Sequence, residues 1–473
     1  MNTTKTGFLL DKAHSFHFNS HISKTAWPPV LNPWAGGVIS LLYQLDQTQW
    51  WPLKDIEQQQ LRQANILVKH SVANSPFYQA LFQEHGITTT NMTSWEEWRQ
   101  LPIIDRKMLQ AATKDWQSQI IPEDHGQQME YFTSGSTGMP LRSCHTTLGL
   151  LFKTAMVLRQ HHWSQENTQL KAAYIQESSN PHAAKLRFAK NWETLTNNVI
   201  ETGPAMVMSP QLSTEEHLAH LCDFQPNYLF SYPSIIATLA KHAIKHGIDL
   251  PFLQQIGTYG EVLEPHTRHL VKHAWGIDVT DGYSAKEIGP IALQCPHAHH
   301  YHVQSEALIV EVLNNDNEPC KPGEIGRLVI TVLHNFSHPI IRYAIGDYAI
   351  PGDPCACGRN LPVLEKIIGR QRNMLLYPDG SQRWPSLKES DLSHASQNDF
   401  PAIHQFQILQ HSVERLEAKV VTEKPWSIQE EHQIVYYLKN QLGSHWQIDI
   451  SYQDHIERGK NGKFEDFISY CQA

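Results

Sequence analysis

Apolar residues recur at helical spacing near the start of the chain. Between Leu61 and Gln83 they return every three or four positions, and this pattern is interrupted once, at Ser75-Pro76. Proline is well tolerated in the first turn of a helix, so the pattern predicts two consecutive helices, the second starting at Pro76. We expect residues 1–60 to form a helical extension in front of the main domain.

From Gln127 to about Arg370, short β-prone runs alternate with amphipathic stretches and glycine-bearing turns. Residues 227–232 predict a buried strand, residues 234–246 a helix and residues 255–259 a further strand, which together make one βαβ unit. Residues 326–333 and 339–349 predict two later strands, the second with a turn at Gly346-Asp347. This alternation predicts an α/β sheet domain.

The last hundred residues follow a different pattern. Residues 403–409, 415–421 and 447–452 alternate between apolar and polar positions as strands do. Residues 427–442 have helical spacing. The stretch Gly369–Pro385 is rich in Gly, Pro, Asp and Arg, which is typical of a linker. The sequence therefore predicts a large, multi-layer α/β domain over residues 1–370, followed by a small, mobile α+β lid domain over residues 371–473.

Composition and charge argue against several classes of partner and location. The chain has 473 residues, 41% of them apolar and 18% charged, and a formal net charge of −9, which is not the basic field that attracts nucleic acid. The apolar run Phe8–Leu10 is too short for a secretory signal, and the most apolar stretch, Gly36–Tyr43, has about half the length of a membrane-spanning helix. We therefore expect a cytoplasmic protein with neither nucleic-acid nor membrane partners.

Hydroxyl and glycine residues are concentrated directly after the β-prone Tyr131-Phe132. The run is Thr133, Ser134, Gly135, Ser136, Thr137 and Gly138. Glycine lets backbone N–H groups converge on an anion, and the hydroxyls add donors, so this composition favours a phosphate-binding turn. It is not a Walker loop, because no Gly-Lys-Ser/Thr closes it. Taken alone, such a composition is more commonly a Ser/Gly surface turn.

Together with four later motifs, this run resembles the phosphate loop of the adenylate-forming enzymes, the superfamily of acyl-CoA synthetases, peptide-synthetase adenylation domains and luciferases. The later motifs are Tyr259–Glu264, Asp281–Gly289, Arg342–Asp347 and Arg458–Phe464. Ser75–Tyr78, Leu101-Pro102-Ile103 and Lys107 are similar to the phenylacetate-CoA ligase branch and its relatives from polysaccharide and secondary-metabolite clusters. The resemblance covers nearly the whole chain after about residue 35.

The resemblance implies a role for each matching residue around ATP and Mg²⁺. Gly260 and Glu261 would lie on the adenine side, with Asp281, Gly282, Tyr283 and Ser284 in the aromatic loop that follows. Glu287 would hold Mg²⁺ as a hard oxygen ligand, and Asp347 and Arg370 would contact the ribose. Lys463 would bridge the acid carboxylate and the phosphate during adenylation, so we expect Lys463 and Glu287 to be catalytic. Taken alone, Glu287 would fit a solvated acid, Asp347 a turn residue and Lys463 an exposed basic loop.

Cysteines and histidines form a second candidate site. Cys295 precedes four histidines, and Cys355 and Cys357 are two residues apart. Thiolates and imidazoles are the ligands of a tetrahedral structural Zn²⁺, and such sets occur in phenylacetate-CoA ligase relatives. We predict Cys295, His302, Cys355 and Cys357 as ligands, with His297, His299 or His300 as replacements for His302. The alternative is a His-rich surface loop with free thiols.

The resemblance implies activation of a small carboxylic acid as an acyl-adenylate with release of pyrophosphate. The many aromatic residues of the chain favour an aromatic or small apolar acid. The acyl group would pass to a thiol, either CoA or the phosphopantetheine of an acyl carrier protein, and the enzyme could be a homodimer. The stretch Tyr377–Pro385 differs from the family's glycine-rich segment, which leaves transfer to a nitrogen nucleophile as an alternative. A nucleotide-binding accessory protein without turnover is the third interpretation.

Overall fold

The chain forms two compact units, Met1–Ile368 and Gly369–Ala473, and each is described by itself. The structure is a computed structural model, and it describes residues 16–18, 20–25, 27–132, 141–178, 180, 182–192, 194–385, 403–459 and 462–471. No helix in these ranges is both long enough and apolar enough to span a bilayer.

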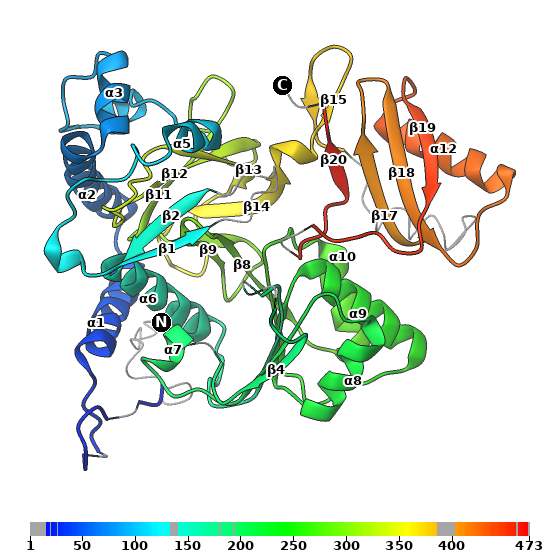
Figure 1. The fold of residues 1–473 in the computed structure, drawn as a ribbon, viewed down its shortest axis with the longest axis horizontal. Coiled ribbons are helices and arrows are strands. Elements are labelled where there is room, and N and C mark those ends of the chain that lie inside the picture. The colour runs from blue at the N-terminus through cyan, green and yellow to red at the C-terminus, as the bar shows by residue number, and fades with distance from the viewer. Residues whose placement is uncertain are drawn as a thin grey trace. The chain divides into compact units, whose positions relative to one another are not determined.

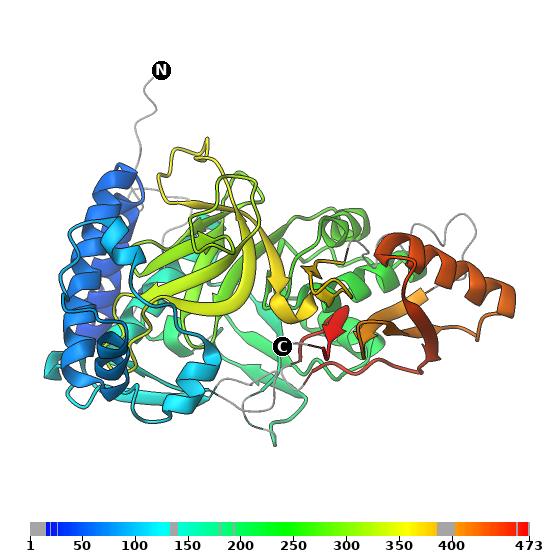
Figure 2. The same ribbon diagram turned by 90° about the horizontal axis from the view of Figure 1, so that it is seen from above.

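Helices at one end of the first unit build a large part of its core (Figure 2). Their bounds are α1 Pro33–Thr48, α2 Leu53–Asn74, α3 Pro76–Glu84, α4 Trp95–Arg99 and α5 Arg106–Ala112. The predicted break at Ser75-Pro76 is confirmed. The side chain of Asn32 caps α1, and Val38, Leu42 and Leu45 of α1 are buried in the core that α6 (Thr147–Trp163) shares. Helix α1 is therefore an integral part of the unit.

A mixed sheet of twelve strands crosses the first unit, counted within the described residues. The strands run in the order β11-β12-β13-β14-β10-β9-β8-β7-β6-β3-β5-β4. Their bounds are β3 Ala172–Ile175, β4 Leu186–Ala189, β5 Ala205–Met208, β6 Tyr228–Ser231, β7 Gln255–Tyr259, β8 Val279–Ala285, β9 Gly289–Gln294, β10 Tyr301–Val303, β11 Leu308–Leu313, β12 Gly326–Val332, β13 Tyr343–Pro351 and β14 Val363–Arg370. Strands β8, β7, β6, β3 and β5 are parallel to one another.

Helices lie on both faces of the parallel strands (Figure 1). Helices α8 Thr214–Phe224, α9 Pro233–His246 and α10 Pro265–Trp275 cover one face, and α6 with α1 lies on the other side. The unit β6-α9-β7 confirms the predicted βαβ unit, because its two strands pair in parallel through Leu229 and Ile256. Helix α7 (Thr194–Asn197) and a separate hairpin of β1 (Gln128–Phe132) with β2 (Arg142–Thr146) complete the unit.

The turn predicted at Gly346-Asp347 is wrong, because β13 continues through it. Gly346 has a φ of +86°, a conformation that favours glycine, and the pairing with β12 shifts in register between Arg327 and Val329. The glycine therefore makes a β-bulge instead of reversing the chain.

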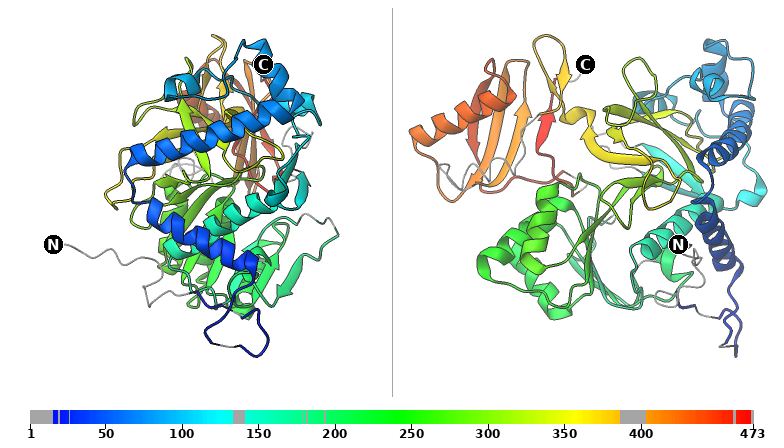
Figure 3. Two further views of the ribbon diagram at one scale, coloured as in Figure 1. Left: turned by 90° about the vertical axis from the view of Figure 1, so that its left-hand side faces the viewer. Right: turned by 180° about the vertical axis from the view of Figure 1, so that it is seen from behind.

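The second unit pairs a four-stranded sheet with one long helix (Figure 3). Strands β17 Ile403–Gln410, β18 Arg415–Thr422, β19 Gln447–Tyr452 and β20 Phe467–Ser469 run in the order β19-β18-β17-β20, and the helix is α12 Ile428–Leu442. Ser427 and Glu430 form a reciprocal capping box at the start of α12. Phe406, Leu438 and Trp446 are buried in its core. The predicted fold class, a large α/β part followed by a small α+β part, is confirmed.

The stretch predicted as a linker is folded. Strands β15 (Leu375–Leu376) and β16 (Gln382–Arg383) form a hairpin, and Leu375 is fully buried in the core of the second unit. The Gln410 side chain accepts from the backbone N–H of Leu376 at 2.9 Å and donates to its carbonyl at 2.6 Å. Pro, Asp and Gly here form the tight turn of a hairpin, a role that composition does not distinguish from a linker.

Candidate nucleotide and metal sites

The first group of predicted residues lies where the parallel strands end. Gly260 follows β7 with a φ of +82°, and Glu261 comes next. One carboxylate oxygen of Glu261 accepts the backbone N–H of Ser234, in the first turn of α9, at 3.0 Å. The motif thus binds two consecutive βα connections together at the carboxyl edge of the sheet, which is where α/β folds bind ligands.

Tyr283 and Asp347 are brought together although they come from β8 and β13, which are not neighbours in the sheet. The Tyr283 hydroxyl donates to Asp347 Oδ2 at 2.6 Å, and Asp347 is only 7% exposed. Short O–H···O⁻ bonds of this kind are strong because the acceptor is charged. The structure therefore joins the aromatic ring predicted for adenine to the carboxylate predicted for ribose.

Glu287 is buried beside a cation that the sequence did not single out. Glu287 is 6% exposed, and its Oε1 lies 3.7 Å from Nη1 of Arg106, the first residue of α5. Burial raises the pKa of the Tyr343 hydroxyl, the Glu287 charge raises it further, and Arg106 lowers it. Arg106, Glu287 and Tyr343 thus form one electrostatic group. The available signal was a basic residue three positions after the Leu101-Pro102-Ile103 motif.

Asp281 points into the protein. Its carboxylate accepts from Thr258 Oγ1 and from the Tyr301 hydroxyl, both at 2.6 Å, and burial raises its pKa. Next to it, a side chain at Gly282 would come within 3.2 Å of the Gln160 amide on α6. Ser284 is exposed. These contacts give Asp281 a structural role, and its part in nucleotide binding stays a prediction.

The predicted phosphate loop, Thr133 to Gly138, lies outside the described residues. Its stem is described, because β1 and β2 pair antiparallel with Phe132 opposite Arg142. Arg142 forms an ion pair across this stem with Glu130, and that contact lowers the pKa of Glu130. Strands β1 and β2 therefore flank the predicted loop in the sequence.

Lys463 and Arg370 belong to the second unit. The carbonyl of Lys463 accepts the N–H of Gly459 at 2.9 Å, and Gly462 has a φ of +75°. The backbone N–H of Arg370 donates to Asn373 Oδ1 at 3.3 Å. Each residue thus has a backbone hydrogen bond within the second unit, and a contact of either side chain with ATP stays a prediction.

The four predicted zinc ligands converge. One ligand atom from each of Cys295, His302, Cys355 and Cys357 lies within 4.8 Å of the others, in the part of the chain that the structure covers. Cys295 Sγ is 3.7 Å from Cys355 Sγ, and Cys357 Sγ is 3.4 Å from His302 Nε2. Nδ1 of His302 lies 3.3 Å from the Leu361 carbonyl, which leaves Nε2 facing the thiols.

This donor set fits Zn²⁺. Three sulfur atoms and one imidazole nitrogen are a common set for a closed tetrahedral site, and four protein ligands leave no position open for a reaction. Burial lowers the pKa of His302 to about 4, so its imidazole is in the neutral form that binds metals. Among the alternatives, His300 is also close, with Nε2 3.0 Å from Cys355 Sγ.

The residues that follow Cys355 and Cys357 contact the connection between α1 and α2. Arg359 Nε donates to Gln49 Oε1 at 2.9 Å, and its guanidinium lies 5.0 Å from the Trp50 ring and 4.5 Å from the Trp163 ring. The backbone N–H of Asn360 also donates to the Gln49 carbonyl, at 2.9 Å. The Cys/His cluster therefore adjoins a packed corner.

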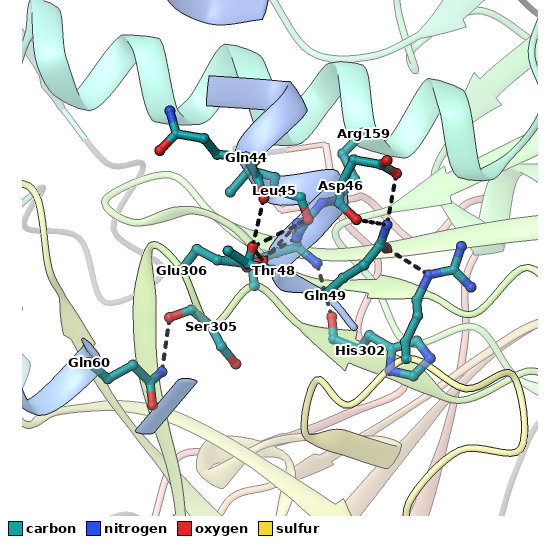
Figure 4. Close-up of polar contacts among 12 residues, drawn as sticks. Gln44, Leu45, Asp46, Thr48, Gln49, Gln60, Arg159, His302, Ser305 and Glu306 are labelled. Atoms are coloured by element: carbon teal, nitrogen blue, oxygen red, sulfur yellow. Dashed lines mark hydrogen bonds and ion pairs between the residues drawn. The ribbon is translucent and has the colours of Figure 1, made fainter. Parts of the chain in front are cut away.

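A buried ion pair reinforces the same corner (Figure 4). Arg159 Nη2 lies 2.8 Å from Glu306 Oε1, and this carboxylate also accepts the Thr48 hydroxyl at 2.6 Å. Arg159 further donates to the Leu45 carbonyl and to Gln304 Oε1. The contacts of Arg159 lower the pKa of Glu306 despite its burial. The end of α1 is thus tied to α6 by a buried ion pair.

A polar cavity of about 290 Å³ lies beside the cluster, at the edge where the parallel strands begin. Gln255 starts β7 and Thr280 is the second residue of β8, whereas Gly260 and Glu287 follow the other ends. The lining residues are Gln160, Trp163, Ser164, Gln165, Gln255, Thr280, Asp281, Leu293, Gln294, Cys295, Pro296 and His297. Asp281 is the one predicted nucleotide residue among these, so this cavity is not the place where the others meet.

Two family profiles match the chain. The profile of the AMP-binding enzyme family matches residues 69–337, more than half of the chain, and that of the CapK C-terminal domain matches residues 382–469. Phenylacetate-coenzyme A ligase of Pseudomonas putida is 24% identical over 352 residues, covering 70% of this chain and 74% of that protein. The ligase of the same name from Escherichia coli (strain K12) is 21% identical over 365 residues, covering 74% and 78%.

Solved structures of one acyl-CoA ligase share the fold. 2-Hydroxyisobutyryl-CoA ligase in its postadenylation state aligns with a TM-score of 0.69 at 18% identity, covering 89% of this chain and 91% of that chain. The same ligase with 2-HIB-AMP and CoA in the thioesterification state aligns with a TM-score of 0.58 at 19% identity, covering 89% and 91%.

Proposed function

The chain belongs to the AMP-binding enzyme family, and we propose that it activates a small carboxylic acid with ATP as an acyl-adenylate and then transfers the acyl group to a thiol. The observation that carries the proposal is the junction of Tyr283 with Asp347, near the carboxyl edge where Glu287 is also buried. Tyr283 and Asp347, 64 residues apart, meet there, which supports one shared binding site for a nucleotide.

The residues supply electrostatics and position. When a carboxylate attacks the α-phosphate of ATP, negative charge approaches negative charge, so the reaction needs cations and donors more than an acid or a base. Asp347 would accept the ribose hydroxyls and fix the α-phosphate in line for attack. Lys463 would lie between the acid carboxylate and the phosphate and reduce their repulsion. Glu287 would hold Mg²⁺, which supplies charge neutralisation when bound.

CoA is the acceptor that the comparisons favour. The similar proteins are named as ligases of coenzyme A, and one solved structure of the shared fold contains CoA with an acyl-adenylate. The named acids of these proteins, phenylacetate and 2-hydroxyisobutyrate, are an aromatic and a small acid. They agree with the substrate class proposed here.

The Cys/His cluster would hold a structural Zn²⁺. Cys295, His302, Cys355 and Cys357 supply four ligands. An ordered metal loop would fix Arg359, which contacts Gln49 and Trp50 between α1 and α2. Such an ion would stabilise the first unit and take no part in the reaction.

Acid-dependent exchange of labelled pyrophosphate into ATP tests the proposed activity. A panel of aryl, short-chain hydroxy and amino acids is compared in the wild type and in Lys463→Ala. We expect exchange with one acid class and a loss of about 10²- to 10³-fold in the variant, with ATP affinity and melting temperature retained. Lack of exchange with every acid, despite measurable ATP binding, would contradict the proposal.

A further inference from the structure

A guanidinium group lies at the carboxylate proposed to hold Mg²⁺. Arg106 Nη1 is 3.7 Å from Glu287 Oε1, and the two side chains are 28% and 8% exposed. This distance is an ion pair and is too long for a hydrogen bond. Arg106 therefore lies on the more open side of a buried acid.

The backbone that carries Arg106 is fixed by β13. The N–H of Ile104 donates to the Arg342 carbonyl at 3.0 Å, and the N–H of Ala344 donates back to the Ile104 carbonyl at 2.8 Å. These bonds attach the segment before α5 to the strand that contains Asp347. Arg106 is thus positioned by the same strand as the carboxylate proposed to bind ribose.

Arg342 reinforces this attachment from within. It is 1% exposed, its φ of +48° is unusual for a residue with a side chain, and its guanidinium pairs with Glu311 at 3.0 Å. It also donates to the Leu101 carbonyl at 2.5 Å. Conformations of this kind persist where their surroundings hold them. Arg342 is therefore committed to structure, whereas Arg106 lies beside the carboxylate proposed to hold Mg²⁺.

We propose that Arg106 binds the phosphates of ATP during adenylation and the pyrophosphate that this step releases. The acid oxygen bonds to the α-phosphorus, the bond from this phosphorus to the bridging oxygen breaks, and pyrophosphate leaves with that electron pair. Arg106 stays protonated throughout and gains contact with the leaving group as its charge grows. The inference rests on the proposed function.

The chemistry favours phosphate as the ligand of Arg106. A residue that holds Mg²⁺ must face the phosphates that the ion neutralises, so a cation beside Glu287 faces them as well. A guanidinium has five N–H donors in a planar fork that matches two phosphate oxygens. The competing interpretation is that Arg106 only neutralises Glu287 until Mg²⁺ displaces it.

Kinetics of Arg106→Gln and Arg106→Lys test the inference, with Arg62→Gln on exposed α2 as the matched control. Pyrophosphate exchange is measured against ATP and Mg²⁺, together with the Kd of ATP and the melting temperature. We expect Arg106→Gln to raise the KM for ATP about tenfold and to lower exchange about 10²-fold, and Arg106→Lys to recover part of the loss. Arg62→Gln should match the wild type.

Each other outcome has a distinct meaning. Unchanged exchange in Arg106→Gln overturns the inference, as does an unchanged KM for ATP with a reduced Mg²⁺ requirement, which supports the competing interpretation. A fall in melting temperature that accounts for the loss in both variants also overturns it, because the role would be structural. Absence of exchange in the wild type is a failure of the proposed function instead.

Discussion

The two candidate sites lie at opposite edges of one sheet and are built in opposite ways. Glu287 and Asp347 are buried carboxylates. Glu287 forms a loose ion pair with Arg106 at 3.7 Å, and Asp347 accepts the Tyr283 hydroxyl at 2.6 Å. The Cys/His cluster gathers four metal ligands within 4.8 Å and adjoins packed aromatic rings. A site that must accept and release a charged ligand needs acids that can exchange partners, whereas a structural site is complete within the protein.

Substitution at the cluster should have the largest effect, and on stability alone. Cys357→Ser removes one of the four ligands, so we expect loss of about one Zn²⁺ per chain and a clear fall in melting temperature, since the binding free energy of a structural metal contributes to folding. Metal analysis and thermal unfolding measure both. Cys222→Ser, on exposed α8, is the control. No zinc after expression with ample zinc would exclude the proposed ion.

Arg359→Ala should lower the melting temperature less, with zinc retained, because it removes the hydrogen bond to Gln49 and two cation–π contacts beside the cluster. Equal loss of zinc in this variant would mean that Arg359 shapes the ligands themselves.

Substitution at the proposed nucleotide site should have the opposite effect, changing ATP kinetics and leaving stability nearly unchanged. Asp347→Asn removes the charge that accepts the Tyr283 hydroxyl and, as proposed, the ribose hydroxyls, so the KM for ATP should rise by about 10- to 100-fold with little change in melting temperature. Tyr283→Phe should have a smaller effect in the same direction, and the two losses should not add, because the residues share one bond. Steady-state kinetics against ATP tests this. A loss of stability in place of a KM effect would remove the contrast between the two edges.

The core of the first unit should respond to pH through its buried histidines, with a smaller effect than the substitutions at the two sites. Burial lowers the pKa of His145, His334 and His338 to about 4, against about 6.5 in the unfolded chain. The unfolded state then binds more protons between these values, so stability is complete above about pH 6.5 and falls as the pH drops toward 4. Denaturant unfolding at pH 7 and pH 5 should show this decrease.

His338→Gln should weaken the pH dependence, whereas His273→Gln on exposed α10 should leave it unchanged. Equal stability at both pH values would show that these imidazoles do not stay neutral in the folded state.

Patterns along the chain predicted the elements well where hydrophobic spacing was regular. The helix break at Ser75-Pro76, the βαβ unit and the strands of the second unit are confirmed, and so are the fold class and the family. The errors fall on glycine-rich stretches. At Gly346 a positive φ makes a bulge and not a turn, and in the predicted linker Leu375 is buried, which local composition does not reveal.

By itself, the sequence determined which residue types were available: hydroxyls and glycines for phosphates, acids for a metal and ribose, and thiols for zinc, each in a motif short enough to recognise. Only the tertiary structure decided which of them meet. Tyr283 reaches Asp347 across non-adjacent strands, and Arg106 reaches Glu287 from a helix 181 residues earlier. Such contacts depend on how the sheet and its helices pack over long sequence separations, and no local pattern of apolar and polar positions contains that information.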